Sequence, residues 1–167
     1  LKSKKNKIEI QNLKIAHIFD GVALVKLFFW IDQFKNKKKL NEISSQKKLE
    51  SFRKKNSFYL GPSFPPISGF NKNAAIIHYN ATNKTNLSLT GTGIYLLDTG
   101  GQYPWGTTDV TRTISLGKPN LYKKNIYTRV LKGHLALKNF QLKDDTTGAQ
   151  LDRAARKYLK QIGLDYP

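Results

Sequence analysis

The sequence predicts an α+β fold, in which helices form an outer layer on an antiparallel sheet. The segment 8–34 carries apolar residues at close to helical spacing, which predicts a long helix. After Phe58 the pattern changes to SFPPISGF, whose prolines exclude a helix and suit an irregular edge strand. Two β-prone runs, 94–97 and 107–114, flank a glycine-rich loop and predict a hairpin.

Length and composition limit the class of protein. The chain has 167 residues, which is the length of one domain, and no cysteine. No segment approaches the roughly 20 apolar residues of a membrane span, and no apolar run follows a basic start as in a secretory signal. These features predict a soluble cytoplasmic protein with no membrane partner.

The formal charge of +18 would by itself suggest a nucleic-acid partner. The charge comes mainly from lysines in terminal or loop-like runs such as 2–7 and 35–39, and no stacking platform or arginine fork is apparent. We therefore predict no nucleic-acid partner.

The first predicted helix, 8–34, contains three residues that need an interpretation. Gly21 lies in its middle at a cost of about 1 kcal/mol relative to alanine, which indicates close packing there. His17 and Asp20 are assigned no chemistry, because a lone histidine on a helix is more often a surface or packing residue than a ligand.

A second helix, 44–56, follows Asn41, with Leu49 and Phe52 as its buried stripe. Further on, 74–79 predicts a buried strand because Ile-Ile lies within it. His78 stands at the exposed end of this strand, where it is either an ordinary polar residue or part of a site.

Two more helices follow the hairpin. The first, 119–140, has Pro119 in its first turn, where the missing N–H is tolerated. The second, 148–162, ends naturally at Gly163. His134 lies in the earlier of these helices and is interpreted as structural.

Two carboxylates flank the glycine-rich loop of the hairpin. If the strands pair with Asp98 opposite Asp109, the two side chains share one face of the sheet. Opposed carboxylates repel unless a proton or a cation lies between them, and a divalent metal prefers such oxygen ligands. The alternative is that each aspartate caps backbone amides as ordinary turn chemistry, and the spacing alone does not decide between the two.

The amino-acid sequence of this segment carries more information than the spacing of its two aspartates. DTGGQYPWGTTDVTRT (98–113) closely resembles the DSGAQYxxGTTDVTRT signature of eukaryotic Xaa-Pro aminopeptidases, which are metallopeptidases with the pita-bread fold also found in prolidase, creatinase and methionine aminopeptidase. Four further segments resemble family segments in the same order: LKIAHIFDGVALVKLFFW (13–30), NAAIIHYNAT (73–82), VLKGHLAL (130–137) and GLDYP (163–167).

The resemblance implies that 1–167 is the amino-terminal half of a pita-bread catalytic domain, with helices packed on a curved antiparallel sheet and 1–7 as a basic lead-in. In the family, one His and two Glu complete the metal site, and they follow the GLDY segment. The carboxy-terminal half of the domain is therefore expected to lie outside this chain.

The resemblance also implies site roles. Asp98 would bind one metal ion through both oxygens, Asp109 would bridge two ions, and His78 would bind substrate. The ions would be two Mn²⁺, with zinc or cobalt as alternatives, and they would present a bridging hydroxide to the first peptide bond of peptides with proline in second position. No catalytic residue beyond the metal ligands is expected here, so 1–167 alone is expected to be inactive, whereas the intact protein would be a homodimeric Xaa-Pro aminopeptidase.

Two alternatives remain within this resemblance. One is a prolidase-type dipeptidase on the same fold, and the other is a non-enzymatic pita-bread interaction module. Such a module would be expected to have lost its ligands, so Asp98 and Asp109 argue against it. The sequence motif GGQYPWGTTDVTRT favours the aminopeptidase over the dipeptidase.

Overall fold

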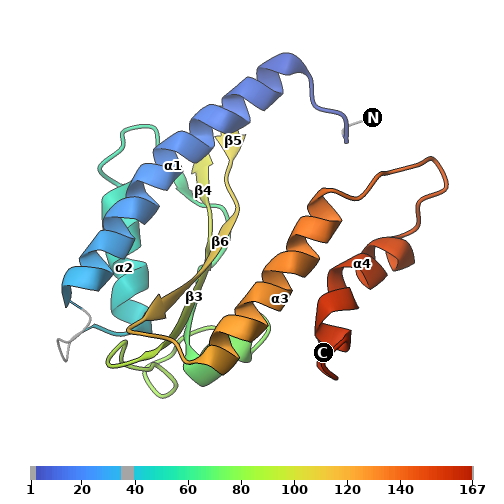
Figure 1. Cartoon of the computed structure of the whole chain (residues 1–167). Helices are drawn as coiled ribbons and strands as arrows, with labels where there is room; N and C mark the ends of the chain where they lie inside the picture. The colour runs from blue at the N-terminus through green and yellow to red at the C-terminus, as the bar shows by residue number, and fades with distance from the viewer. Residues whose placement is uncertain (1–2, 35–39, 167) are drawn as a thin grey trace. The chain divides into compact units, whose positions relative to one another are not determined.

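The computed structural model describes residues 3–34 and 40–166, so the first two residues of the expected basic lead-in lie outside it. The chain divides into two compact units, Leu1–Lys118 and Pro119–Pro167. Figure 1 shows the elements in order. The first unit contains α1 (Lys7–Phe34), α2 (Glu42–Arg53), β1 (Gly61–Pro62), β2 (Ile67–Phe70), a 3-10 helix (Asn71–Ala75), β3 (Gly93–Thr99), β4 (Gly101–Tyr103), β5 (Gly106–Thr107) and β6 (Val110–Leu116), and the second contains α3 (Leu121–Lys138) and α4 (Gly148–Lys160).

Side-chain caps fix where the first two helices begin. The Glu9 backbone N–H donates to Asn6 Oδ1 over 2.9 Å, and Glu9 Oε2 accepts from the Asn6 N–H over 2.8 Å, so α1 begins at Lys7. A similar capping box joins Asn41 and Ser44, so α2 begins two residues before the predicted start and ends at Arg53. Within the described residues no helix is both long and apolar enough to cross a membrane.

The strands form two three-stranded antiparallel sheets, ordered β1-β4-β5 and β2-β3-β6. Together with the helices they confirm the α+β class. Gly100 separates β3 from β4, and Thr108 with Asp109 separates β5 from β6, so the predicted return strand is interrupted at its start. One hairpin therefore contributes strands to both sheets: β3 and β6 belong to one sheet, and β4 and β5 belong to the other.

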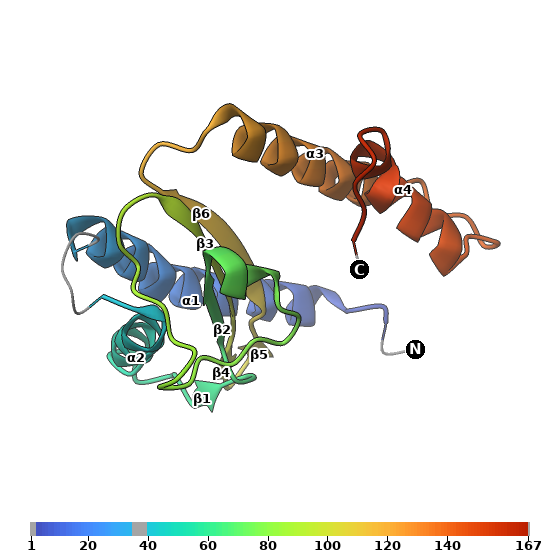
Figure 2. The same ribbon diagram turned by 90° about the horizontal axis from the view of Figure 1, so that it is seen from below.

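The core lies between the sheet and the first two helices. Along β3 the side chains of Tyr95, Leu97 and Thr99 are buried, whereas the alternate ones are only partly buried. Figure 2 shows α1 and α2 on the same side of the β2-β3-β6 sheet, which agrees with the expected single helical layer. The buried apolar residues of this core are Ala23, Leu24, Leu27, Ile31, Leu40, Leu49, Phe70, Leu89, Tyr95, Leu97 and Leu116.

Gly21 does not mark close packing. A Cβ built on it would have no described neighbour within 4 Å, so that prediction is wrong. Close packing at a helical glycine is found instead at Gly133 in the second unit, where a Cβ would lie 2.2 Å from the Ala155 carbonyl oxygen of the neighbouring α4.

The segment 74–79 is not a strand. The 3-10 helix ends at Ala75 and a turn follows it, with Ile76 and Ile77 52% and 68% exposed. His78 lies in this turn with a left-handed φ of 54°. The apolar Ile-Ile pair therefore belongs to the surface, and the predicted buried strand is wrong.

The buried carboxylate of Glu42 explains why this segment leaves the extended conformation. Glu42 is 0% exposed, and it accepts hydrogen bonds from the Phe70 N–H over 2.7 Å, the Tyr79 hydroxyl over 2.8 Å and the Leu87 N–H over 3.0 Å. The Asn73 side-chain amide also donates to it, over 3.1 Å. Because a buried carboxylate needs several donors, these contacts override the β propensity of the intervening residues.

The second unit is a pair of packed helices. Asn120 caps α3, so Pro119 precedes the helix instead of lying in its first turn as predicted. Thr147 and Gln150 form a capping box at the start of α4. Gly163 has a φ of +72° just after this helix, which agrees with its predicted role as a stop.

The core predicts a loss of stability at alkaline pH. Burial raises the pKa of Tyr95 to about 12, from 10.0, and its hydroxyl bonds Ser45 and Ser68. Between pH 10 and 12 the folded state therefore keeps a proton that the unfolded state releases. The contribution of Tyr95 to the free energy of unfolding is fully present below pH 10 and is lost as the pH rises through this range. We expect this loss to lower the free energy of unfolding by about 1.4 kcal/mol per pH unit.

Urea denaturation at pH 9, 10, 11 and 12 measures this effect, with Tyr95→Phe as the matched variant. Tyr95→Phe should have the shallower decline above pH 10, because it has no phenol to ionise. Equal slopes for the two proteins would show that Tyr95 does not titrate with a raised pKa.

Candidate metal centre

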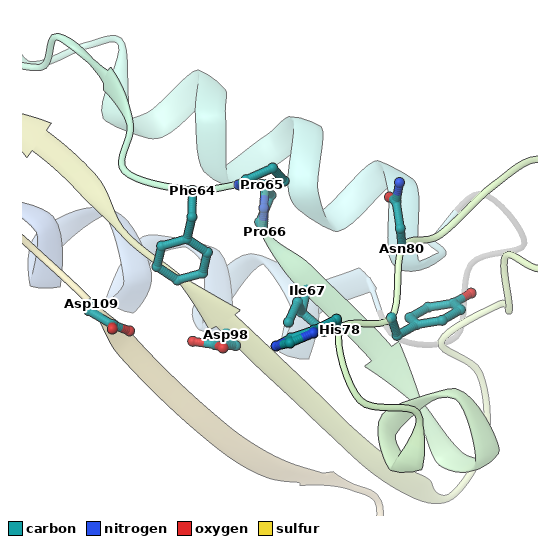
Figure 3. Close-up of a pocket in the computed structure, with 9 residues that line it drawn as sticks. Phe64, Pro65, Pro66, Ile67, His78, Asn80, Asp98 and Asp109 are labelled. Carbon is teal, nitrogen blue, oxygen red and sulfur yellow. The ribbon is translucent and has the colours of Figure 1, made fainter.

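All three predicted site residues line one pocket of about 490 Å³ (Figure 3). Asp98 comes from the end of β3, Asp109 from the two-residue break before β6, and His78 from the turn after the 3-10 helix. Three separate segments thus bring these side chains together. The other lining residues are Phe64, Pro65, Pro66, Ile67, Tyr79 and Asn80.

The register of the hairpin differs from the predicted one. Asp98 pairs with Thr111, not with Asp109, so the expected pairing is wrong by two residues. Side chains two residues apart on a strand share a face, and Asp109 stands two residues before Thr111. The two aspartates therefore lie diagonally on the same face instead of directly opposite one another.

The turn at the tip of the hairpin sets this register. In β4 and β5, Gln102 pairs with Thr107 and Tyr103 with Gly106, which leaves Pro104 and Trp105 as the turn. The same register continues through β3 and β6, where Thr99 pairs with Val110. A two-residue turn therefore replaces the long loop that the glycines suggested.

The two carboxylates differ in their surroundings. Asp98 is partly buried, and its Oδ1 accepts a hydrogen bond from Thr111 Oγ1 over 2.8 Å. Asp109 is exposed, and among the described residues no hydrogen bond or ion pair holds its carboxylate. Neither side chain caps a backbone amide of the described chain, which is what the turn interpretation would require.

The donor set fits part of a metal site. Carboxylate oxygens suit hard divalent cations, and Asp98 keeps free acceptor capacity beside its one hydrogen bond. In the described ranges, no group of three or more His, Cys, Asp or Glu residues is arranged to hold a metal ion. The pocket thus offers two carboxylates and an imidazole but not a complete ligand set.

Sequence reasoning missed the apolar wall of the pocket, which consists of Phe64, Pro65, Pro66 and Ile67. The sequence pattern predicts only an irregular edge strand for these residues. Pro66 is anchored from α2, because Gln46 Nε2 donates to its carbonyl oxygen over 3.0 Å. The signal that could have revealed the wall is the Phe-Pro-Pro run, since such a rigid apolar segment suits one side of a pocket.

Comparison with known proteins identifies the family of the chain. Residues 11–167 match the model of Metallopeptidase family M24. The chain is 45% identical to an uncharacterized peptidase of Schizosaccharomyces pombe, with 99% of this chain and 28% of that protein covered. It is 44% identical to an Xaa-Pro aminopeptidase of Drosophila melanogaster, with 99% and 27% covered.

A solved structure shows the same fold. The X-prolyl aminopeptidase of Caenorhabditis elegans, described as a cytosolic enzyme with a di-nuclear active site, matches with a TM-score of 0.87 and 34% identity. The match covers 97% of this chain and 27% of that one, so the chain spans about a quarter of the length of its relatives. Because both the family model and these relatives match nearly the whole chain, it belongs to metallopeptidase family M24 and has the expected pita-bread fold.

Proposed function

We propose that 1–167 is the amino-terminal half of the catalytic domain of an Xaa-Pro aminopeptidase, and that it supplies half of a dinuclear metal site. The observation that carries this proposal is the placement of Asp98, Asp109 and His78 around one pocket. The names of the Drosophila and Caenorhabditis relatives support the substrate class.

In this proposal the two aspartates hold the metal. Asp98 would ligate one ion, with its carboxylate oriented by the Thr111 hydroxyl, and Asp109 would ligate both ions. When bound, two divalent ions lower the pKa of a water molecule and polarise the scissile carbonyl. We propose manganese, with zinc or cobalt as alternatives.

His78 would act on the substrate and not on the metal. Its imidazole lines the same pocket as Asp98. The turn that carries it is anchored by the next residue, because the Tyr79 hydroxyl donates a hydrogen bond to Glu42. An imidazole N–H placed there can donate to the substrate carbonyl as negative charge develops on its oxygen. The apolar wall beside it would keep water from that side of the bond.

The remaining ligands, one His and two Glu, would come from further along the intact protein. A dinuclear site needs more donors than two carboxylates provide. We propose that the intact protein is a cytoplasmic homodimer that acts on proline-containing peptides.

The test uses the intact protein, stripped of metal and titrated with Mn²⁺. Three substrates are compared: a tripeptide with proline second, a matched tripeptide with alanine second, and an Xaa-Pro dipeptide. The proposal expects Mn²⁺-dependent release of the first residue of the proline tripeptide, and no turnover by 1–167 alone. Turnover of the dipeptide only would indicate a prolidase, and two bound ions without turnover would indicate an interaction module.

We expect His78→Ala to lower kcat of the intact protein about 100-fold, the effect typical of losing one donor to a developing oxyanion. Bound Mn²⁺ should stay at the wild-type amount. Steady-state kinetics and metal analysis on the same samples measure both effects. His134→Ala is the matched control, since His134 is an exposed histidine of α3. If His78→Ala lost metal, His78 would be a ligand and the assigned role would be wrong.

A further inference from the structure

A buried polar cluster lies directly behind the bend of the hairpin. It consists of Asp20 on α1, Arg53 at the end of α2, Thr99 on β3, Tyr103 on β4 and Thr108. All five residues are at most 2% exposed. We call this group the Asp20–Arg53 cluster, and sequence reasoning had assigned none of its members a role.

An ion pair forms its centre. Arg53 Nε donates to Asp20 Oδ1 over 2.7 Å, and Arg53 Nη2 donates to Asp20 Oδ2 over 2.9 Å. The third contact of this guanidinium goes to the sheet, because Arg53 Nη1 donates to Thr99 Oγ1 over 2.8 Å. The rigid fork of the guanidinium thereby ties both helices to the end of β3.

The Asp20 carboxylate also holds the second half of the hairpin. The Thr108 hydroxyl donates to Asp20 Oδ2 over 2.9 Å, and the Tyr103 hydroxyl donates to Asp20 Oδ1 over 3.0 Å. Burial and the charge of Asp20 raise the pKa of Tyr103, so its phenol stays protonated as a donor. Every oxygen of this buried carboxylate thus has two donors, as a buried charge requires.

Thr108 connects the cluster to the backbone of the bend. Its Oγ1 accepts from the Gly101 N–H over 2.8 Å, and its own N–H donates to the Gly101 carbonyl over 2.9 Å. The Thr108 carbonyl accepts from Ser63 Oγ over 2.9 Å. The backbone on both sides of the bend is therefore fixed by named contacts.

The positions of the two threonines matter because of their neighbours. Thr99 directly follows Asp98, and Thr108 directly precedes Asp109. Both threonine side chains are buried in the cluster, whereas both aspartates line the pocket. Alternating side-chain directions give this arrangement, so fixing each threonine fixes the backbone from which the next carboxylate projects.

We propose that Asp20 and Arg53 are positioning residues, which set the separation of the Asp98 and Asp109 carboxylates through Thr99 and Thr108. This inference rests on the proposed metal role of the two aspartates. A metal site needs its ligands held within about 0.5 Å of the working geometry, and Asp109 has no hydrogen bond of its own among the described residues to hold it. A buried ion pair adds little net stability, so its value here is the geometry that it imposes.

The test removes one hydroxyl while keeping its shape. In the intact protein, Thr108→Val loses the bonds to Asp20 and Gly101, whereas Thr108→Ser keeps the hydroxyl. Tyr95→Phe is the control, since it deletes a buried hydroxyl of the same core whose described contacts lie outside the hairpin bend. Two quantities are measured at a temperature where all variants are folded by circular dichroism: the Mn²⁺ dissociation constant, from the electron paramagnetic resonance signal of free Mn²⁺, and amide hydrogen exchange of 98–109 in metal-free protein.

We expect Thr108→Val to weaken Mn²⁺ binding about 10- to 100-fold and to raise exchange across the bend, with Thr108→Ser and Tyr95→Phe close to wild type. Wild-type Mn²⁺ affinity and exchange in Thr108→Val would overturn the inference, even if its melting temperature fell. If the wild-type protein bound none of Mn²⁺, Zn²⁺ and Co²⁺, the proposed function would be overturned instead. Thr99→Val, with Thr99→Ser as its rescue, repeats the test on the Asp98 side and decides the question if Thr108→Val does not fold.

Discussion

Asp109→Asn is expected to abolish peptidase activity of the intact protein while leaving its fold in place. In the proposed site this carboxylate neutralises both ions through two equivalent oxygens, whereas an amide offers one weaker oxygen and no charge. A loss of several kcal/mol of transition-state stabilisation lowers kcat/KM by a factor of about 1,000 or more. The fold is expected to survive because Asp109 is exposed and no described side chain bonds it.

Metal analysis and kinetics on the same preparation measure this prediction, and the bound Mn²⁺ should fall from two ions per chain to one or none. Asp144→Asn is the matched control, because Asp144 is an exposed aspartate of the loop before α4. Two ions per chain and a near-normal rate in Asp109→Asn would contradict the dinuclear interpretation. The aspartate pair would then have no role in binding two metal ions.

Gly100→Ala is expected to disrupt the hairpin bend and with it the metal site. A Cβ on Gly100 would lie 1.9 Å from the Thr108 carbonyl oxygen and 2.1 Å from Ser63 Oγ. The first of these atoms belongs to the backbone, so the two strands have to separate. We expect the free energy of unfolding to fall by about 3 kcal/mol, the upper end of the usual cost of overpacking.

Urea denaturation measures this loss, and Mn²⁺ titration measures the damage to the site. Gly148→Ala is the control, since a Cβ there meets no described atom within 4 Å and Gly148 is the first residue of α4. The control should be neutral or slightly more stable, because alanine favours a helix. Equal stability of the two variants would show that the bend tolerates a side chain at Gly100.

Local patterns in the sequence were enough to predict most of the fold. Helical spacing located the four helices to within a few residues, and alternation placed Asp98 and Asp109 on one face of the sheet. The register was missed because residues 98–106 look like a loop, whereas they include strand residues on both sides of a two-residue turn at Pro104 and Trp105. The position of the turn decides which residues pair across the hairpin. An error of two residues in the register leaves each side chain on the correct face of the sheet but gives it the wrong partner on the other strand.

Contacts between distant segments could not be predicted in this way. The turn that holds His78 depends on Glu42, whose partners Phe70 and Leu87 are 28 and 45 residues away along the chain. Asp20 and Thr108 are 88 residues apart. Neither buried carboxylate differs from a surface one in the sequence, because its donors come from elements that only folding brings together.

These separations along the chain also imply an order of assembly. Thr111 bonds Asp98 across 13 residues, whereas Glu42 reaches Tyr79 across 37. Closing a longer loop costs more entropy, so local pairings tend to form earlier in folding. We therefore expect amide protection in β3 and β6 to appear before protection at Leu87 when refolding is followed by pulsed hydrogen exchange. The part of the pocket that carries Asp98 and Asp109 would then form first, and it could bind a cation before the turn that carries His78 has folded.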